Sequence, residues 1–212
     1  MMENLDDLVN KLARDAVPVK PAPHPYVLSL EWIAAAAAYL AVSLALSGTR
    51  PDLAAKFHEP WFVAEICTLL GIFIATTISA ALLVFPDLHQ KRGVAFAPVA
   101  FFVLFLPVIL FAWHADSPSA PLPVHSFECT VSITLMALLP SVWTFYAMRK
   151  FASTHSRWAG GIALLSAFSI GALWLRLHEI NDSITHLILW HYLPMLAIGL
   201  IGMWLGKKLL KW

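Results

Sequence analysis

Six long apolar segments constrain this chain more than any other feature. A helix that crosses a bilayer needs about 20 apolar residues, and six segments reach that length, near residues 26–46, 61–85, 94–113, 127–148, 158–177 and 187–206. They lack the apolar–polar alternation of barrel strands, and a helix satisfies its own backbone groups in hydrocarbon. Charged residues make up only 13% of the 212 residues, against about 25% in soluble domains. The sequence therefore predicts an all-α fold, a polytopic bundle of six transmembrane helices.

The basic residues of the polar connections fall mainly on one side of these six segments. That side carries eleven of the fourteen basic residues, namely Lys11, Arg14, Lys20, Lys91, Arg92, Arg149, Lys150, Arg157, Lys207, Lys208 and Lys211. Because basic loops stay in the cytoplasm, we expect both termini to be cytoplasmic. The first apolar segment is long enough to act as an uncleaved signal anchor. A net charge of +1 gives no basic field for direct nucleic-acid binding.

The first 25 residues differ from the six-span domain predicted for residues 26–212. Leu5, Leu8, Val9, Leu12 and Ala16 recur at helical spacing on one face, which predicts a short amphipathic helix. Four prolines in residues 18–25 predict a stiff, extended linker. Helices that lie on lipid are usually rich in Lys and Arg, whereas this one has more acidic than basic residues. We therefore expect a partner-binding cytoplasmic arm, with a frayed terminus as the alternative.

Potential metal ligands gather on the other side of the predicted membrane. His58, His114, His125, His178 and His186 lie in or beside the loops there, and His191 lies about one turn into the sixth segment. Acidic groups accompany them: Glu59, Asp116, Glu128, Glu179 and Asp182. Because an ionisable group within a span is costly, we expect Glu65, Glu128 and His191 to face the bundle interior or water.

The spacing of these groups permits chelation. His125 and Cys129 are four residues apart and would share a helix face, and His178, Asp182 and His186 would do so if that turn were helical. His186 and His191 are five apart, about 140° around an α-helix, so we expect no shared face. The candidate ligands are Cys129, His125, Glu128, His178, Glu179, His186 and His191. Such a mixed set suits Zn(II) or another divalent transition metal; ordinary loop histidines and a helix-capping Glu128 are the alternative.

Two further groups are candidates for signal sensing. Glu65 and Cys67 lie shallowly in the second segment. A disulfide between Cys67 and Cys129 is conceivable in an oxidising periplasm, but the depth of Cys67 favours a buried free thiol.

Three stretches carry a resemblance to a known family. They are LVNKLARDAVPVKPAPHP (8–25), Cys129 followed by LLPSVWTFYAMRKFA (138–152), and LRLHEINDSITHLILWHYLP (175–194). In this order the chain resembles the NrsF-like membrane anti-sigma factors, negative regulators of extracytoplasmic-function sigma factors. The resemblance implies a protein of the bacterial inner membrane whose arm holds such a sigma factor away from RNA polymerase and releases it on a periplasmic metal or oxidative signal. The implied sigma-binding residues are Leu5, Leu8, Val9, Leu12, Val17, Pro18 and Pro21.

One departure from the family pattern concerns the sensor. Where the family has a cysteine after the histidine, this chain has Glu179 after His178. The change argues against a two-thiol sensor, whereas a metal site with Cys129, His178 and Glu179 would survive it, since carboxylate can replace thiolate as a harder ligand.

Two other function classes are less consistent with the sequence. A small metal-ion transporter or other metal-binding membrane protein is the alternative, but a conduction path needs charged groups near the bilayer midplane, and here they lie near span ends. The sequence shows no nucleophile elbow and no glycine-rich phosphate loop, so we expect a protein that is not an enzyme.

Overall fold

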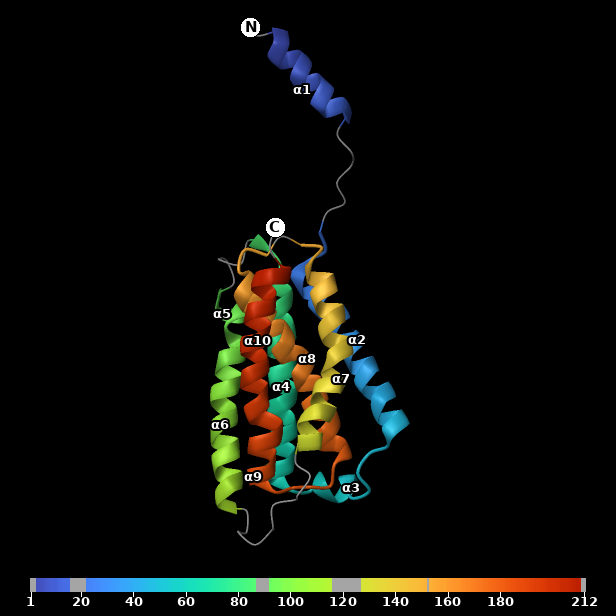
Figure 1. Cartoon of the computed structure of the whole chain (residues 1–212), viewed down its shortest axis with the longest axis vertical. Helices are drawn as coiled ribbons and strands as arrows, with labels where there is room; N and C mark the ends of the chain where they lie inside the picture. Colours follow the sequence, from blue (N-terminus) through green and yellow to red (C-terminus); the bar gives the residue numbers. More distant parts are fainter. Residues whose placement is uncertain (1–2, 16–21, 87–91, 116–126, 152, 211–212) are drawn as a thin grey trace.

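The computed structural model describes residues 3–15, 22–86, 92–115, 127–151 and 153–210, and every regular element within these ranges is a helix (Figure 1). The predicted all-α fold is confirmed, and six of its helices are long and apolar enough to cross a membrane. The elements are α1 (Glu3–Asp15), α2 (Pro25–Ser47), α3 (Leu53–Lys56), α4 (Pro60–Leu83), α5 (Arg92–Ala95), α6 (Ala97–Ala115), α7 (Phe127–Met148), α8 (Ser156–His178), α9 (Ile184–His186), a π-helix (Leu187–Tyr192) and α10 (Leu193–Leu209).

Local chemistry explains where the long helices begin and end. Pro25 and Pro60 occupy the first turns of α2 and α4, where a missing backbone N–H is harmless. The imidazole Nδ1 of His24 accepts a hydrogen bond from the Tyr26 backbone N–H, at 3.3 Å, and caps α2. Gly48 ends that helix with a φ of 80°, a backbone conformation that favours glycine.

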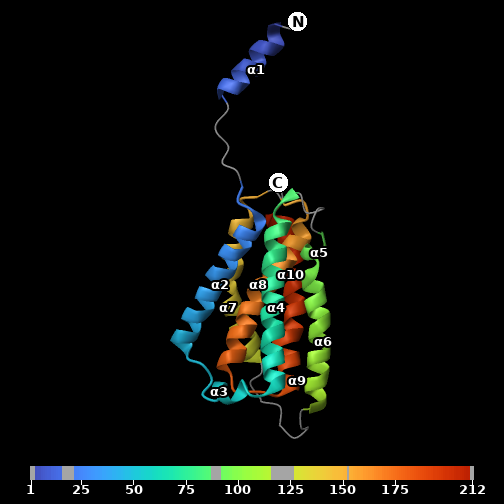
Figure 2. The same cartoon turned by 180° about the vertical axis from the view of Figure 1, so that it is seen from behind.

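Helix α8 lies at the centre of the bundle and packs against α2, α4, α7 and α10 (Figure 1, Figure 2). Small residues permit its close approach to α10, as expected where apolar lipid supplies little drive for association. A Cβ atom built on Gly202 would lie 2.5 Å from the Gly160 carbonyl oxygen and 2.9 Å from the Gly161 Cα. Helices α2 and α6 are peripheral, and most of their residues are exposed on an apolar surface suited to lipid contact.

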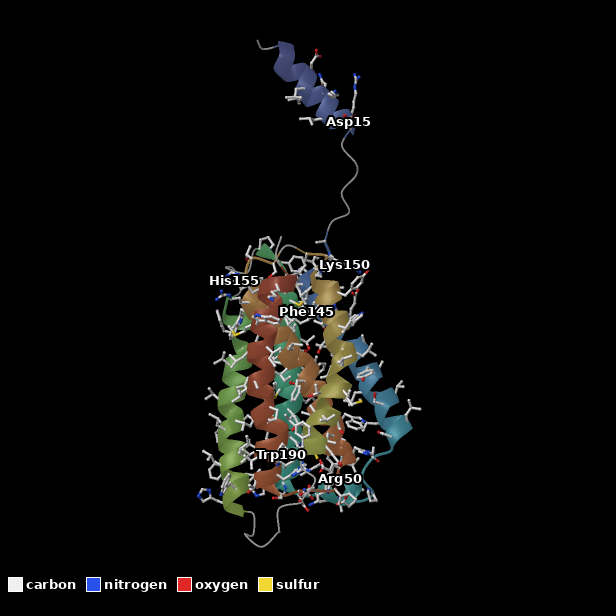
Figure 3. All side chains as sticks on the ribbon, in the orientation of Figure 1. Asp15, Arg50, Phe145, Lys150, His155 and Trp190 are labelled. Carbon is white, nitrogen blue, oxygen red and sulfur yellow. The ribbon has the colours of Figure 1, made fainter. Side chains whose placement is uncertain are left out.

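The bundle has two distinct ends. Helix α1 stands apart from the bundle, beyond the end at which α2 begins and the C-terminus lies (Figure 1). Figure 3 shows Lys150 and His155 at this same end, and Arg50 and Trp190 at the opposite one. We call the opposite end the distal end; it comprises residues 48–59, the start of α7, and residues 179–192.

Candidate functional site

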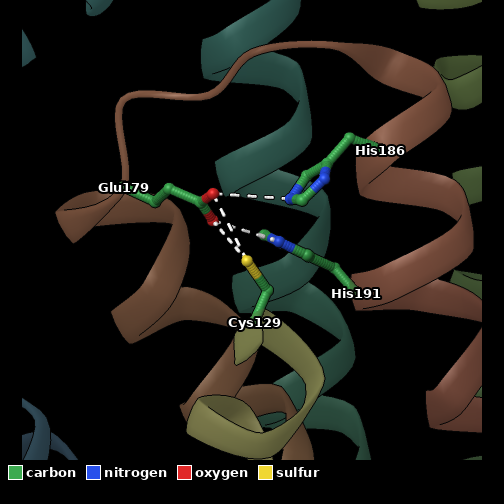
Figure 4. A group of neighbouring side chains, drawn as sticks. All are labelled: Cys129, Glu179, His186 and His191. Carbon is green, nitrogen blue, oxygen red and sulfur yellow. Dashed lines mark hydrogen bonds and ion pairs between the residues drawn. The ribbon is translucent and has the colours of Figure 1, made fainter. Parts of the chain in front are cut away.

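Four side chains with metal-binding chemistry converge at the distal end (Figure 4). They are Cys129 in the first turn of α7, Glu179 directly after α8, His186 at the end of α9, and His191 in the π-helix. One ligand atom from each lies within 4.8 Å of the other three. We call these residues the donor cluster.

The Glu179 carboxylate lies between the other three members of the donor cluster. The Cys129 thiol donates to its two oxygens, with S···O distances of 3.4 and 3.5 Å. The Nε2 atoms of His186 and His191 lie 3.4 and 3.2 Å from the carboxylate oxygens. Burial opposes ionisation of Glu179, but the contacts with His191, Cys129 and His186 outweigh it and hold the pKa of this carboxyl below its usual range.

A π-helix brings the two histidines together, contrary to the α-helical expectation. Residues five apart do not share a face of an α-helix, and this spacing predicted that His186 and His191 would diverge. In a π-helix the hydrogen bonds join residues five apart, so the Leu187–Tyr192 segment returns His191 to the side of His186. Their ring centroids are 5.1 Å apart. The prediction was wrong because it assumed α-helical geometry throughout the sixth span.

The imidazoles of His186 and His191 are buried, and their ring nitrogens lack hydrogen bonds within the described part of the chain. Both residues are 1% exposed, and none of their four ring nitrogens has a hydrogen-bond partner among the described residues. Buried polar groups are normally hydrogen-bonded, and each exception calls for an explanation.

The structure excludes some sequence-predicted ligands from the donor cluster. Glu128 is exposed in the first turn of α7 and does not belong to the donor cluster. His178 instead binds the Gly48 carbonyl oxygen through Nδ1, at 2.8 Å, and stacks on Trp174. The predicted trio of Cys129, His178 and Glu179 is therefore not assembled, because His178 points towards the end of α2. His125 lies outside the described residues.

Cys67 also differs from its prediction. It is a free thiol, but it is exposed rather than buried, because it lies on a face of α4 that no other described helix covers. Cys129 is free and buried. Glu65 lies inside the bundle, as the cost of an ionised group in lipid leads one to expect. There it accepts hydrogen bonds from Arg176, at 2.9 Å, and from the Tyr192 hydroxyl.

A set of ion pairs lies beside the donor cluster, and sequence reasoning did not identify it. Asp182 accepts hydrogen bonds from Arg176, at 2.6 Å, and from Arg50, at 2.8 Å through each of two nitrogens. Lys56 lies 2.8 Å from Asp182 and also from Glu59, and Arg50 further binds Asp52 at 2.7 Å. We call Arg50, Asp52, Lys56, Glu59, Glu65, Arg176 and Asp182 the distal ion network.

The electrostatics of this network follow from its geometry. Burial opposes ionisation of Asp182, but hydrogen bonds from Arg50, Lys56 and Arg176 hold the pKa of its carboxyl well below the usual range. Hydrogen bonds to Asp182 and Asp52 raise the pKa of Arg50. The sequence signal was the pair of opposite charges near span ends, Glu65 and Arg176, since such groups require partners inside a membrane protein.

The arm carries an exposed apolar stripe. Leu8, Val9 and Leu12 on α1 are 53%, 56% and 62% exposed. The helix predicted from the spacing is present. The side chain of Leu5 and all of Val17, Pro18 and Pro21 lie outside the described part of the chain.

These features define the class of the protein: an all-helical protein with six candidate membrane spans, a helical arm at one end and a cluster of buried donor groups at the other. The family model described as "Negative regulator of sigma F" (NrsF) matches residues 12–212. The chain therefore belongs to the NrsF family, which consists of non-enzymatic regulators that act on a sigma factor.

A curated relative agrees with this assignment. The chain is 31% identical to the anti-sigma-F factor NrsF of Caulobacter vibrioides, over 98% of this chain and 99% of the relative. The family model begins within α1, at residue 12. No solved structure matches the chain.

Proposed function

We propose that this anti-sigma factor sequesters an extracytoplasmic-function sigma factor through its N-terminal arm and releases it on a periplasmic metal or oxidative signal. In this proposal both termini lie in the cytoplasm, the bundle spans the bacterial inner membrane, and the distal end faces the periplasm. Residues 1–25 form the arm and its linker, and residues 26–212 form the sensor domain. The excess of basic residues in the loops at the terminal end supports this orientation.

The observation that carries the proposal is the uncovered apolar stripe on α1. Leu8, Val9 and Leu12 remain more than half exposed. A helix of 13 residues is marginal by itself in water and is stabilised by packing an apolar face against another surface. An amphipathic helix of this kind typically binds in a hydrophobic groove of a partner. In an anti-sigma family the natural partner is a sigma factor.

A transporter is less consistent with the structure. Among the described residues, the buried arginine, glutamate and histidine side chains are Arg50, Glu65, Arg176, His186 and His191, and all five lie near the distal end. A path for an ion through the membrane would need such groups near the midplane.

Binding of a sigma factor by the arm can be tested with a paired substitution. The full-length protein is co-expressed with each extracytoplasmic-function sigma factor of its host, purified from membranes, and the dissociation constant of the captured sigma factor is measured. Burying the exposed half of Leu8 and Leu12 is worth about 2–3 kcal/mol together. The double variant Leu8→Asp/Leu12→Asp should therefore weaken binding roughly 30–150-fold.

Asn10→Asp is the matched control for this experiment. It adds a negative charge on the opposite face of α1, where it should leave the dissociation constant unchanged. The proposal fails if the Leu8/Leu12 variant binds as tightly as the unaltered protein, or if Asn10→Asp weakens binding equally.

A further inference from the structure

We propose that Cys129, Glu179, His186 and His191 form a four-ligand site for one divalent metal ion of the zinc class, such as Zn(II) or Cd(II). The ligands would be the Cys129 Sγ, one Glu179 carboxylate oxygen and the Nε2 atoms of both histidines. The assignment excludes the neighbouring His178 and Glu128, which the structure places elsewhere.

The spacing of the donor atoms matches this coordination. Metal–ligand bonds of about 2.0–2.3 Å place the corners of a tetrahedron about 3.3–3.8 Å apart. The distances from the Glu179 oxygens to Cys129 Sγ are 3.4 and 3.5 Å, and those to the histidine Nε2 atoms are 3.4 and 3.2 Å. All four donors lie within 4.8 Å of one another. His186 contacts one Glu179 oxygen and His191 the other, so an ion held by a single carboxylate oxygen would require side-chain shifts of up to about 1 Å.

The burial of His186 and His191 independently supports metal coordination at the donor cluster. An imidazole nitrogen without a hydrogen bond is costly inside a protein. Both rings are 1% exposed, and their nitrogens have no hydrogen-bond partner among the described residues. The Nε2 atoms nevertheless point at a carboxylate that a thiol also approaches (Figure 4). The Glu179 carboxylate that they contact has no proton to donate when ionised, so coordination would give each Nε2 lone pair a partner.

Charge balance favours a divalent ion. On binding, the Cys129 S–H bond breaks, its proton goes to solvent, and the thiolate keeps the electron pair that forms the metal–sulfur bond. With the ionised Glu179 and two neutral imidazoles, the thiolate and carboxylate contribute two negative charges, which one M²⁺ ion cancels. A neutral complex carries a small penalty in a low-dielectric setting. Thiolate and imidazole ligands select zinc-like ions over Mg²⁺ or Ca²⁺, which prefer oxygen.

A disulfide would not serve this site. The other cysteine, Cys67, is an exposed free thiol on α4, and Glu179 occupies the position beside the Cys129 sulfur. Metal coordination is therefore the chemistry for which the four side chains are suited.

Metal binding would join three segments of the distal end. Cys129 belongs to α7, Glu179 to the loop after α8, and the two histidines to α9 and the π-helix. One ion would fix these segments relative to one another and so favour one bundle conformation. The use of this shift to release a sigma factor rests on the proposed function, whereas metal binding itself does not.

Co²⁺ provides a direct test because it is a spectroscopic substitute for zinc. Full-length protein in detergent micelles is stripped with a chelator, titrated with Co²⁺, and then titrated with Zn²⁺. We expect one Co²⁺ per chain, with visible bands of tetrahedral cobalt, a near-ultraviolet thiolate-to-cobalt charge-transfer band, and loss of both on addition of Zn²⁺. Saturation at one ion without the charge-transfer band would overturn the assignment of Cys129.

Variants identify the ligands. Glu179→Gln and His191→Asn should each weaken Co²⁺ binding at least about 100-fold, since even outer partners of a metal ligand can contribute that much. Cys129→Ser should remove the charge-transfer band. Glu128→Gln and His178→Asn are the matched controls, one residue away from a ligand, and should bind as the unaltered protein does. The proposal is overturned if the controls lose as much affinity as the ligand variants, or if Cys129→Ser keeps the charge-transfer band.

A thiol-protection assay covers the case in which a ligand variant fails to fold. In the Cys67→Ser background, Zn²⁺ should slow maleimide modification of Cys129 at least tenfold, and an unchanged rate would overturn the site.

Release is measured separately, as the effect of Zn²⁺ on sigma-factor capture. If Zn²⁺ binds but leaves capture unchanged, the regulatory link fails and the metal site stands; if the arm variants still capture the sigma factor, the proposed function fails instead.

Discussion

Neutralising Asp182 should weaken the distal end measurably. In Asp182→Asn the side chain keeps its shape but loses the charge that holds Arg50, Lys56 and Arg176, whose nitrogens lie 2.6–2.8 Å from it. Each such charged hydrogen bond contributes about 1.5–3 kcal/mol. Adding these contributions would overstate the loss of folding stability, because Arg50 retains its ion pair with Asp52 and Arg176 retains its ion pair with Glu65.

Two features determine how much folding free energy Asp182→Asn loses. Removing the sole partner of a buried charge costs about 3–5 kcal/mol. Here the Asp182 side chain is 32% exposed, water can replace part of the interaction, and the asparagine oxygen still accepts a hydrogen bond. We therefore expect a loss of about 2–3 kcal/mol, or a fall in Tm of roughly 5–10 °C for a chain of this size.

The pH dependence gives a second readout for Asp182→Asn. The pKa of Asp182 is depressed in the folded protein, so its contribution is complete above the unfolded pKa near 3.8 and is lost as pH falls through the folded pKa. The unaltered protein should lose stability on acidification below about pH 5, and the variant should lose less.

Thermal unfolding in detergent, followed by tryptophan fluorescence from pH 3 to 8, measures both effects. Glu59→Gln is the control, because Glu59 is exposed and pairs with Lys56; it should cost less than about 1 kcal/mol. This account of the distal ion network is refuted if Asp182→Asn has the same Tm as the unaltered protein at neutral pH and loses stability to the same extent on acidification.

Two further expectations concern packing and thiols. Gly202→Leu should destabilise the bundle and lower Tm strongly, because a Cβ at this position would clash with the Gly160 carbonyl oxygen and the Gly161 Cα. Gly93→Leu is the control: a Cβ at Gly93 has no neighbour within 4 Å, so this variant should change Tm little. Equal Tm values for the two variants would contradict the packing of α8 against α10. Intact mass spectrometry under non-reducing, denaturing conditions should find two maleimide adducts per chain, at Cys67 and Cys129, and a single species without adducts would contradict the free thiols.

The spans were predictable because hydropathy is local. The fourth predicted segment has the same bounds as α7, Phe127–Met148, and the first, 26–46, falls within α2, Pro25–Ser47. The amphipathic helix of the arm was also predictable, since its periodicity belongs to one short segment.

The donor cluster was only partly predictable, because its geometry is not local. All four members were among the candidates, but the sequence did not separate them from His178 and Glu128. A π-helix, which spacing rules for α-helices do not include, pairs His186 with His191. Tertiary packing between α7, α8 and the sixth span brings Cys129 and Glu179 to them.

The central position of α8 has a consequence for any stimulus received at the distal end. This helix leads directly into Glu179, carries Arg176, and touches α2, α4, α7 and α10. A sliding or rotation of α8 would disturb four interfaces at once, so the bundle should respond as a single cooperative body. Since α2 runs from the opposite end of the bundle to the distal end, a change at the distal end would reach the opposite end through rigid helices.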